Sequence, residues 1–222
     1  MTTLRTYGER CAAARALDLV GERWALLIVR ELLLGPKRFT DLRDGMPNAR
    51  PSVLSQRLRE LEEGGVIQRR KLGPPARTAV YELTEVGRQL ESVVIALGRW
   101  GRLLPTPTGT THTVDSLILA LKWRFDSTRA SELDGSYELR IGDDGFRIDV
   151  EHGQIDVRRG EPAAADAVIE VDPVTLEAIV FDGQAPKQAQ HDGRLTITGD
   201  RALAGRFLRH YRVAGASPVL QS

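Results

Sequence analysis

Apolar and polar positions in the first part of the chain alternate with the period of α-helices. Two such patterns cover residues 12–20 and 22–34, with a break near Gly21 and a Gly-Pro pair after the second. A further short helix is predicted over residues 38–46, where RFTDLRDGM turns its large apolar side chains inward. We therefore expect a helical scaffold before residue 50.

The next segment, RPSVLSQRLRELEEGGVIQRR at residues 50–70, contains a helix with one apolar stripe. Leu54, Leu58 and Leu61 repeat at i, i+4 and i+7, so they are predicted to face the core. The helix is expected to open at Ser52, a residue type that caps helix N-termini, and to end at a pair of glycines.

Two β-rich runs, at residues 66–70 and 78–83, follow with a seven-residue loop between them, which predicts a hairpin. Thr84 is placed to cap one long helix over residues 85–104. Its apolar side is made by Val86, Leu90, Val93, Leu97 and Trp100. An apolar stripe of this length is larger than a small domain covers alone, which predicts contact with a second chain.

The second half of the chain changes period. An amphipathic helix is predicted over residues 114–126, and short runs with strand-like alternation follow it. These runs are SYELRI, FRIDVE, QIDVRR, DAVIEV and RLTITG. Asp172 and Asp200 are placed to cap two more helices, and Pro173 suits the first helical position. Three helices around a sheet of about five strands make an α+β layer.

The expected fold class is therefore two domains. Residues 1–104 form a mainly α domain, residues 113–222 form an α+β domain with a five-stranded sheet, and residues 105–112 form a linker rich in Pro, Thr and Gly. Net charge divides in the same way. Residues 1–104 hold 18 Lys and Arg against 12 Asp and Glu, a net of +6, whereas the rest holds 13 against 18, a net of −5. Only the first half is thus expected to meet a polyanion.

Composition limits the location of the protein. No apolar run approaches the ~20 residues of a membrane span, so no membrane partner is expected. The opening MTTLRTYGER has no apolar signal-peptide segment. Cys11 is the only cysteine, which excludes an intrachain disulfide and fits a reducing compartment. We expect a cytoplasmic protein.

The helix after residue 50 presents a polar face that suits DNA. At about 100° per residue, Ser52 and Gln56 lie opposite the leucines, with Arg59 beside them and Arg57 on the shoulder. Hydroxyl, amide and guanidinium groups bond to base edges and phosphates. A short helix, a turn and this helix make a helix-turn-helix, and the basic hairpin makes a wing. A merely solvated polar face is the alternative.

The predicted partner of this half is double-stranded DNA. The candidate DNA-binding residues are Arg38, Thr40, Arg50, Ser52, Ser55, Gln56, Arg57, Arg59, Arg69, Arg70, Lys71 and Arg77. No grouping of catalytic side chains, metal ligands or cofactor-binding glycines stands out, so we expect no enzyme activity, no metal site and no cofactor.

The stretches ALDLVGERWALLIVRELLLGPKRFTDLRDGMPNARPSVLSQRLRELEEGGVIQRR, YELTEVGRQL and ALGRWG resemble the HxlR family of winged-helix transcriptional regulators. The likeness covers roughly residues 8–104. It implies a homodimer that binds inverted-repeat operators, with the first and last helices of this domain building the contact between the two chains. It also places Cys11 where some members carry a cysteine that senses oxidants or aldehydes, although Ala12 stands where the family usually has proline. A plain structural cysteine is the alternative.

The second half, from SYELRI to GRLTITGDRALAGRFLRHY, resembles the sterol-carrier-protein-2-like domain. Members often enclose an apolar tunnel, and a possible apolar ligand pocket here is lined by Leu121, Phe125, Ile179 and Phe207. Alternatively, these side chains simply fill the core. The resulting interpretation is a transcriptional regulator with a C-terminal domain for an apolar effector. The alternative is a lipid-binding or lipid-transfer protein whose winged domain only dimerises, and such a protein has no need of Ser52, Gln56 and Arg57.

Overall fold

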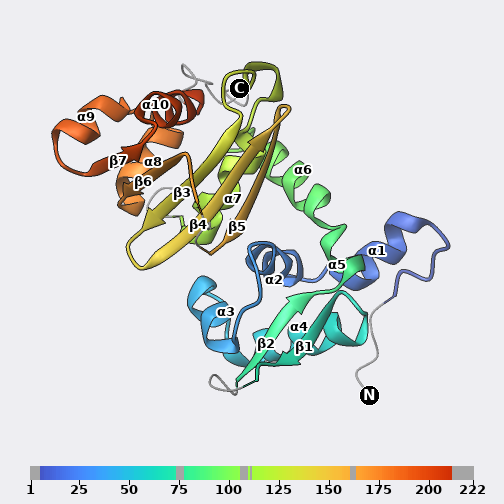
Figure 1. Ribbon diagram of the computed structural model, residues 1–222. Coiled ribbons are helices and arrows are strands. Elements are labelled where there is room, and N and C mark those ends of the chain that lie inside the picture. Colours follow the sequence, from blue (N-terminus) through green and yellow to red (C-terminus); the bar gives the residue numbers. More distant parts are fainter. Residues whose placement is uncertain (1–5, 74–77, 106–109, 111, 161–163, 212–222) are drawn as a thin grey trace. The chain divides into compact units, whose positions relative to one another are not determined.

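The computed structural model describes residues 6–73, 78–105, 110, 112–160 and 164–211 of the 222-residue chain. The chain divides into two compact units, one up to Val94 and one from Ile95 onward (Figure 1). Within the described ranges, no helix is long and apolar enough to cross a membrane.

The first unit is a helical scaffold with a hairpin. Its elements are α1 (Ala12–Val20), α2 (Ala25–Leu32), α3 (Phe39–Gly45), α4 (Pro51–Glu63), β1 (Ile67–Lys71), β2 (Ala79–Leu83) and α5 (Glu85–Arg88), and α6 (Glu91–Gly101) continues past its boundary. Leu54, Leu58 and Leu61 are at most 1% exposed and pack in one core with Ile28 and Val29 of α2. The predicted apolar stripe of α4 is confirmed.

The hairpin of β1 and β2 is antiparallel, as predicted. A third segment joins it, because the Lys37 and Tyr81 backbones exchange two hydrogen bonds, of 2.9 Å and 2.7 Å. The residues just before α3 therefore form part of the wing sheet. This pairing fixes the start of α3 relative to the hairpin.

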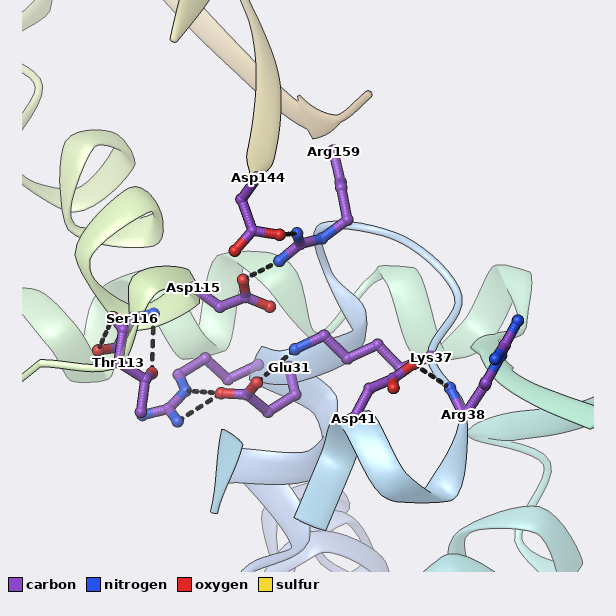
Figure 2. A network of polar contacts seen from close by, with 10 residues as sticks. Glu31, Lys37, Arg38, Asp41, Thr113, Asp115, Ser116, Asp144 and Arg159 are labelled. Carbon is purple, nitrogen blue, oxygen red and sulfur yellow. Dashed lines mark hydrogen bonds and ion pairs between the residues drawn. The ribbon is translucent and has the colours of Figure 1, made fainter. Parts of the chain in front are cut away.

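A buried carboxylate lies beside that junction. Glu31 of α2 is fully buried, and its oxygens accept hydrogen bonds from Lys37 Nζ at 2.5 Å and from Arg30 Nη2 at 2.6 Å (Figure 2). A Cβ on Gly45, the last residue of α3, would overlap Glu31 Oε2. The carboxylate thus lies among α2, the Lys37 segment and the end of α3, and glycine is required where α3 ends.

Two sequence predictions about helix ends in this unit are wrong. The helix α4 begins at Pro51 with Arg50 as its N-cap, so Ser52 lies inside the first turn and is not the cap. Proline suits the first helical position, because its φ is already helical and its missing N–H would have no intrahelical partner. The second predicted helix, over residues 22–34, is shorter and covers only Ala25–Leu32, following Trp24 in a left-handed conformation.

The predicted single helix over residues 85–104 is also wrong, because it is two helices. Thr84 caps α5 as predicted, with its Oγ1 accepting from the Gly87 N–H at 3.0 Å. The N–H groups of Gln89 and Leu90 then bond three residues back instead of four, and α6 starts at Glu91. A Cβ on Gly87 would overlap the Val66 carbonyl oxygen, so this turn packs tightly against the start of the wing.

The second unit is an α+β layer, as predicted. Its elements after α6 are α7 (Val114–Arg124), the 3-10 turn η1 (Ser127–Arg129), β3 (Gly135–Ile141), β4 (Asp144–Glu151), β5 (Gln154–Arg159), β6 (Ala167–Val171), α8 (Pro173–Phe181), α9 (Pro186–His191), β7 (Leu195–Gly199) and α10 (Arg201–His210). The sheet has the order β5-β4-β3-β6-β7, with β3 and β6 parallel and the other pairs antiparallel (Figure 1).

The helix α7 differs from its prediction, because it is not amphipathic. Every residue from Asp115 to Leu121 is buried, and the helix packs against both β5 and α8. Arg159 of β5 ties its first turn to the sheet by ion pairs with Asp115 and Asp144 (Figure 2). The predicted caps Asp172 and Asp200 are confirmed, since their carboxylates accept from N–H groups in the first turns of α8 and α10.

Candidate nucleic-acid interface

The front half of α4 presents polar side chains away from the core. Ser52, Ser55 and Arg59 are exposed, and so is Arg50 at the N-cap. Ser52 and Arg59 lie roughly opposite the leucine stripe and Ser55 lies at its side, because a helix turns about 100° at each residue. The exposed groups are hydroxyls and guanidiniums near a helix N-terminus, where the helix dipole favours phosphate.

Gln56 and Arg57 have partners on the protein itself. Gln56 Nε2 donates to Glu60 Oε1 at 3.0 Å, and Arg57 donates to the other oxygen of the same carboxylate. Arg57 Nη2 also lies 3.4 Å from Glu22 Oε2, in the turn before α2. The Arg57 side chain is only 16% exposed. It therefore joins α4 to the α1–α2 turn, a contact that the helical wheel did not reveal.

The wing strand β1 is basic on its surface. Arg69, Arg70 and Lys71 are exposed, and Arg77 lies outside the described residues. Arg70 Nε donates to Glu82 Oε2 at 3.0 Å, and this guanidinium holds the pKa of Glu82 below its usual value. The Arg69 guanidinium lies 5.9 Å from the centre of the Tyr81 ring, a cation–π distance. In the hairpin register, Glu82, the only acid of β2, pairs with Gln68, whereas Lys71 pairs with Ala79 at the other end of the strand. Lys71 is therefore the basic residue of β1 that lies furthest from Glu82 along the strand.

The start of α3 adds two further predicted residues. Arg38 and Thr40 are exposed, and the Arg38 N–H donates to Asp41 Oδ2 at 2.9 Å, which fixes the first turn (Figure 2). The Lys37–Tyr81 pairing connects this turn to the wing. Sequence reasoning missed the buried Glu31 that supports it. The available signal was the position of this acid in the sequence. Glu31 comes three residues after Ile28 and one before Leu32, on the buried side of α2.

Cys11 is exposed and precedes the first turn of α1. The backbone N–H groups of Ala14 and Ala13 lower the pKa of its thiol. A lowered pKa and exposure are the two properties that a reactive thiol needs. A sensor role for Cys11 stays a prediction.

The four residues predicted to line an apolar pocket lie in the core of the second unit. Leu121 and Phe207 are 1% exposed, Ile179 is fully buried and Phe125 is 8% exposed. The Phe207 ring packs 4.5 Å from that of Tyr137, centroid to centroid. The pocket itself stays a prediction.

Comparison with known families matches the two parts of the chain to two different families. The HxlR-like helix-turn-helix family matches residues 19–107, and the SCP-2 sterol transfer family matches residues 119–209. The chain belongs to the HxlR-like helix-turn-helix family of transcriptional regulators, and it carries an SCP-2 domain after the helix-turn-helix domain.

Several relatives of the first half are named as regulators. An HTH-type transcriptional regulator of Mycobacterium tuberculosis strain H37Rv is 43% identical over 106 residues, which is 47% of this chain and 65% of the relative, just under two thirds of its length. The HTH-type transcriptional regulator YodB of Bacillus subtilis is 34% identical over 95 residues, 43% of this chain and 85% of YodB. The redox regulator HypR in its oxidised form is a similar solved structure, with 31% identity, a TM-score of 0.41 and coverage of 44% of this chain and all of HypR.

The contacts of Arg57 generate a first prediction. Arg57→Ala should lower the stability of the first unit by about 1–2 kcal/mol, because Glu60 and Glu22 lose a charged hydrogen-bond partner. Amide hydrogen exchange in α4 measures this local stability. Arg59→Ala, an exposed arginine of the same helix, is the control and should change exchange by no more than about 0.5 kcal/mol. Equal protection in both variants would show that Arg57 is not a brace.

Proposed function

We propose that this regulator binds an inverted-repeat operator as a homodimer, with α4 in the major groove and the β1–β2 hairpin along the backbone. The observation that carries the proposal is the exposed polar front of α4 beside an exposed basic strand in one winged unit. Ser52, Ser55 and Gln56 are assigned to base edges, and Arg69, Arg70 and Lys71 to phosphates.

The distribution of net charge also supports DNA binding by the first unit. The half that holds the winged unit has a net charge of +6, and the other half has −5. Phosphate repels the acidic half, so contact with DNA is assigned to the first unit alone. The domain boundary at residue 104 remains a proposal, and most of the predicted linker 105–112 lies outside the described residues.

Dimerisation is supported by apolar side chains that lie on the surface of α6. Val93 is 43% exposed, Leu97 46% and Trp100 60%, and Leu17 on α1 is 47% exposed. Leu90, predicted in the same stripe, instead packs against the core of the first unit. Exposed apolar residues on successive turns of one helix are typical of a surface that a second chain covers.

We assign an apolar effector to the C-terminal domain because residues 119–209 match the SCP-2 sterol transfer family. An effector changes DNA binding only if it binds one dimer geometry better than another. The alternative is a lipid-transfer protein whose winged unit only dimerises. The exposed Ser52, Ser55 and Arg59 favour the regulator, since dimerisation through α1 and α6 does not use them.

The DNA assignment predicts two different losses. Gln56→Ala should cost about 1–3 kcal/mol on the operator and relax sequence preference, because a base contact is lost. Lys71→Ala should weaken all sequences alike and reduce the salt slope by about one, because a phosphate contact is lost. Fluorescence anisotropy at several salt concentrations measures both. Lys187→Ala, exposed in the second unit, is the control. Wild-type affinity and salt dependence in both variants would contradict the assignment.

The dimer assignment predicts that one charge on α6 separates the chains. The wild type should scatter light as a dimer at micromolar concentration, with recognition helices about 34 Å apart on DNA. Trp100→Asp should be monomeric, because a desolvated carboxylate destabilises an apolar contact. Val174→Asp places the same charge at a valine that is 72% exposed on α8 and should remain dimeric. A monomeric wild type would overturn the proposal.

The effector assignment predicts stabilisation by apolar ligands. Saturation with oleate or a sterol at about 100 times Kd should add about 2.7 kcal/mol, seen as a higher Tm. Ile179→Trp should remove the response by filling the pocket, whereas Val174→Trp, on the exposed side of the same helix, should keep it. If neither ligand raises the Tm of the wild type, the domain is a structural brace.

A further inference from the structure

An open cleft of about 370 Å³ lies in the second unit, and its lining includes none of the four residues assigned to the apolar pocket. One wall is the segment that follows η1, and the other is the last part of α10. Its lining residues are Arg129, Ser131, Glu132, Leu133, Arg206, Arg209 and His210. Three guanidinium groups therefore meet one carboxylate in a half of the chain whose net charge is −5.

The arginines of the cleft differ from those of the sheet. Arg140, Arg147, Arg158, Arg159 and Arg194 each form an ion pair with a nearby carboxylate. Among the described residues, Arg129, Arg206 and Arg209 form none. Positive charge that gathers in a concave site, in excess of the acids beside it, raises the local concentration of anions.

The walls of the cleft are fixed by hydrogen bonds. Arg206 Nε donates to the Glu132 carbonyl oxygen at 3.0 Å, which leaves the terminal nitrogens of Arg206 as donors. Asp126 Oδ1 accepts from Thr128 N–H and Oγ1, at 3.0 Å and 2.6 Å, and the nearby charge of Arg129 helps to lower the pKa of this carboxylate. Asp126 thus offsets part of the charge of Arg129, whereas Arg206 and Arg209 form no ion pair among the described residues.

His210 contributes a neutral wall. It is 6% exposed, and its Nε2 accepts from the Asp126 N–H at 3.0 Å. The rings of Phe125 and Tyr211 pack at 4.8 Å and 5.3 Å from its own. Burial, and then the nearby Arg129, lower the pKa of His210. The positive charge of the cleft therefore comes from its arginines.

We propose that this cleft binds the phosphate group of an organic phosphomonoester. A guanidinium fork matches phosphate oxygens with two parallel N–H donors, and a dianion balances three arginines and one glutamate better than a single carboxylate does. The cleft falls within the ~300–1,000 Å³ of small-ligand sites, so it has room for the organic part of the ester. The phosphate can belong to a soluble metabolite or to a lipid headgroup. This site is independent of the DNA assignment and of the apolar pocket.

The experiment uses the full chain and calorimetric titration with glycerol 3-phosphate. A parallel arm measures co-sedimentation with phosphatidylcholine vesicles that contain or lack phosphatidic acid. The double variant Arg129→Gln/Arg209→Gln should bind the responsive probe at least about tenfold more weakly, because two charged hydrogen-bond donors are lost. Arg201→Gln, an exposed arginine of α10 outside the cleft, should bind like the wild type.

The two probes distinguish a soluble phosphate ester from a lipid headgroup. Binding of glycerol 3-phosphate identifies a soluble ester, and binding only to vesicles with phosphatidic acid identifies a lipid headgroup. The proposal is overturned if neither probe binds, or if the double variant binds as tightly as Arg201→Gln. Circular dichroism of the variants checks their folding. Operator DNA serves as a separate readout: Lys71→Ala should lose DNA affinity and retain the phosphate response, so the two proposals fail independently.

Discussion

The Glu31 carboxylate is buried in the winged unit with Lys37 bound to one oxygen and Arg30 to the other. Removing either partner of a buried pair leaves a charge without solvation, which is strongly destabilising. The pair therefore keeps Lys37 against α2, and the Lys37 backbone in turn pairs with Tyr81 of the hairpin. This contact links the wing to the start of α3, in addition to the core packing of Ile67 and Leu83 against the helices.

Carboxylates also shape the surface assigned to DNA. Glu60 holds both Gln56 and Arg57 on α4, and Glu82 holds Arg70 on the wing. Under the proposed assignment, Gln56 exchanges its contact for one to a base and Arg70 for one to a phosphate, so part of the gross DNA interaction offsets the lost internal bonds. The same contacts keep long side chains ordered in the free protein, which lowers the entropy cost of binding. In the proposed complex, specificity and affinity are therefore set partly by Glu60 and Glu82, which are not assigned to DNA.

Local rules predicted much of this fold. The strands and the caps Asp172 and Asp200 were identified because alternation and short capping side chains act within a few residues. The single helix at 85–104 failed because its break depends on Gly87 packing against Val66, a tertiary contact. The polar face of α4 was likewise predictable from period alone. The partners of Arg57 were not, since Glu22 comes from the turn between α1 and α2, far from α4 in the sequence.

The burial of α7 on all sides has a consequence for biosynthesis. This helix is made before the strand β5 and the helix α8 that enclose it, since they begin only at Gln154 and Pro173. During elongation the run LILAL of α7 therefore leaves the ribosome before the sheet and the helix α8 that enclose it. Transiently exposed apolar segments of this kind are aggregation-prone and are protected by chaperones. The core of the winged unit is complete by Val94, so this unit is free to fold first. The second unit folds only after the strands of its sheet have been synthesised.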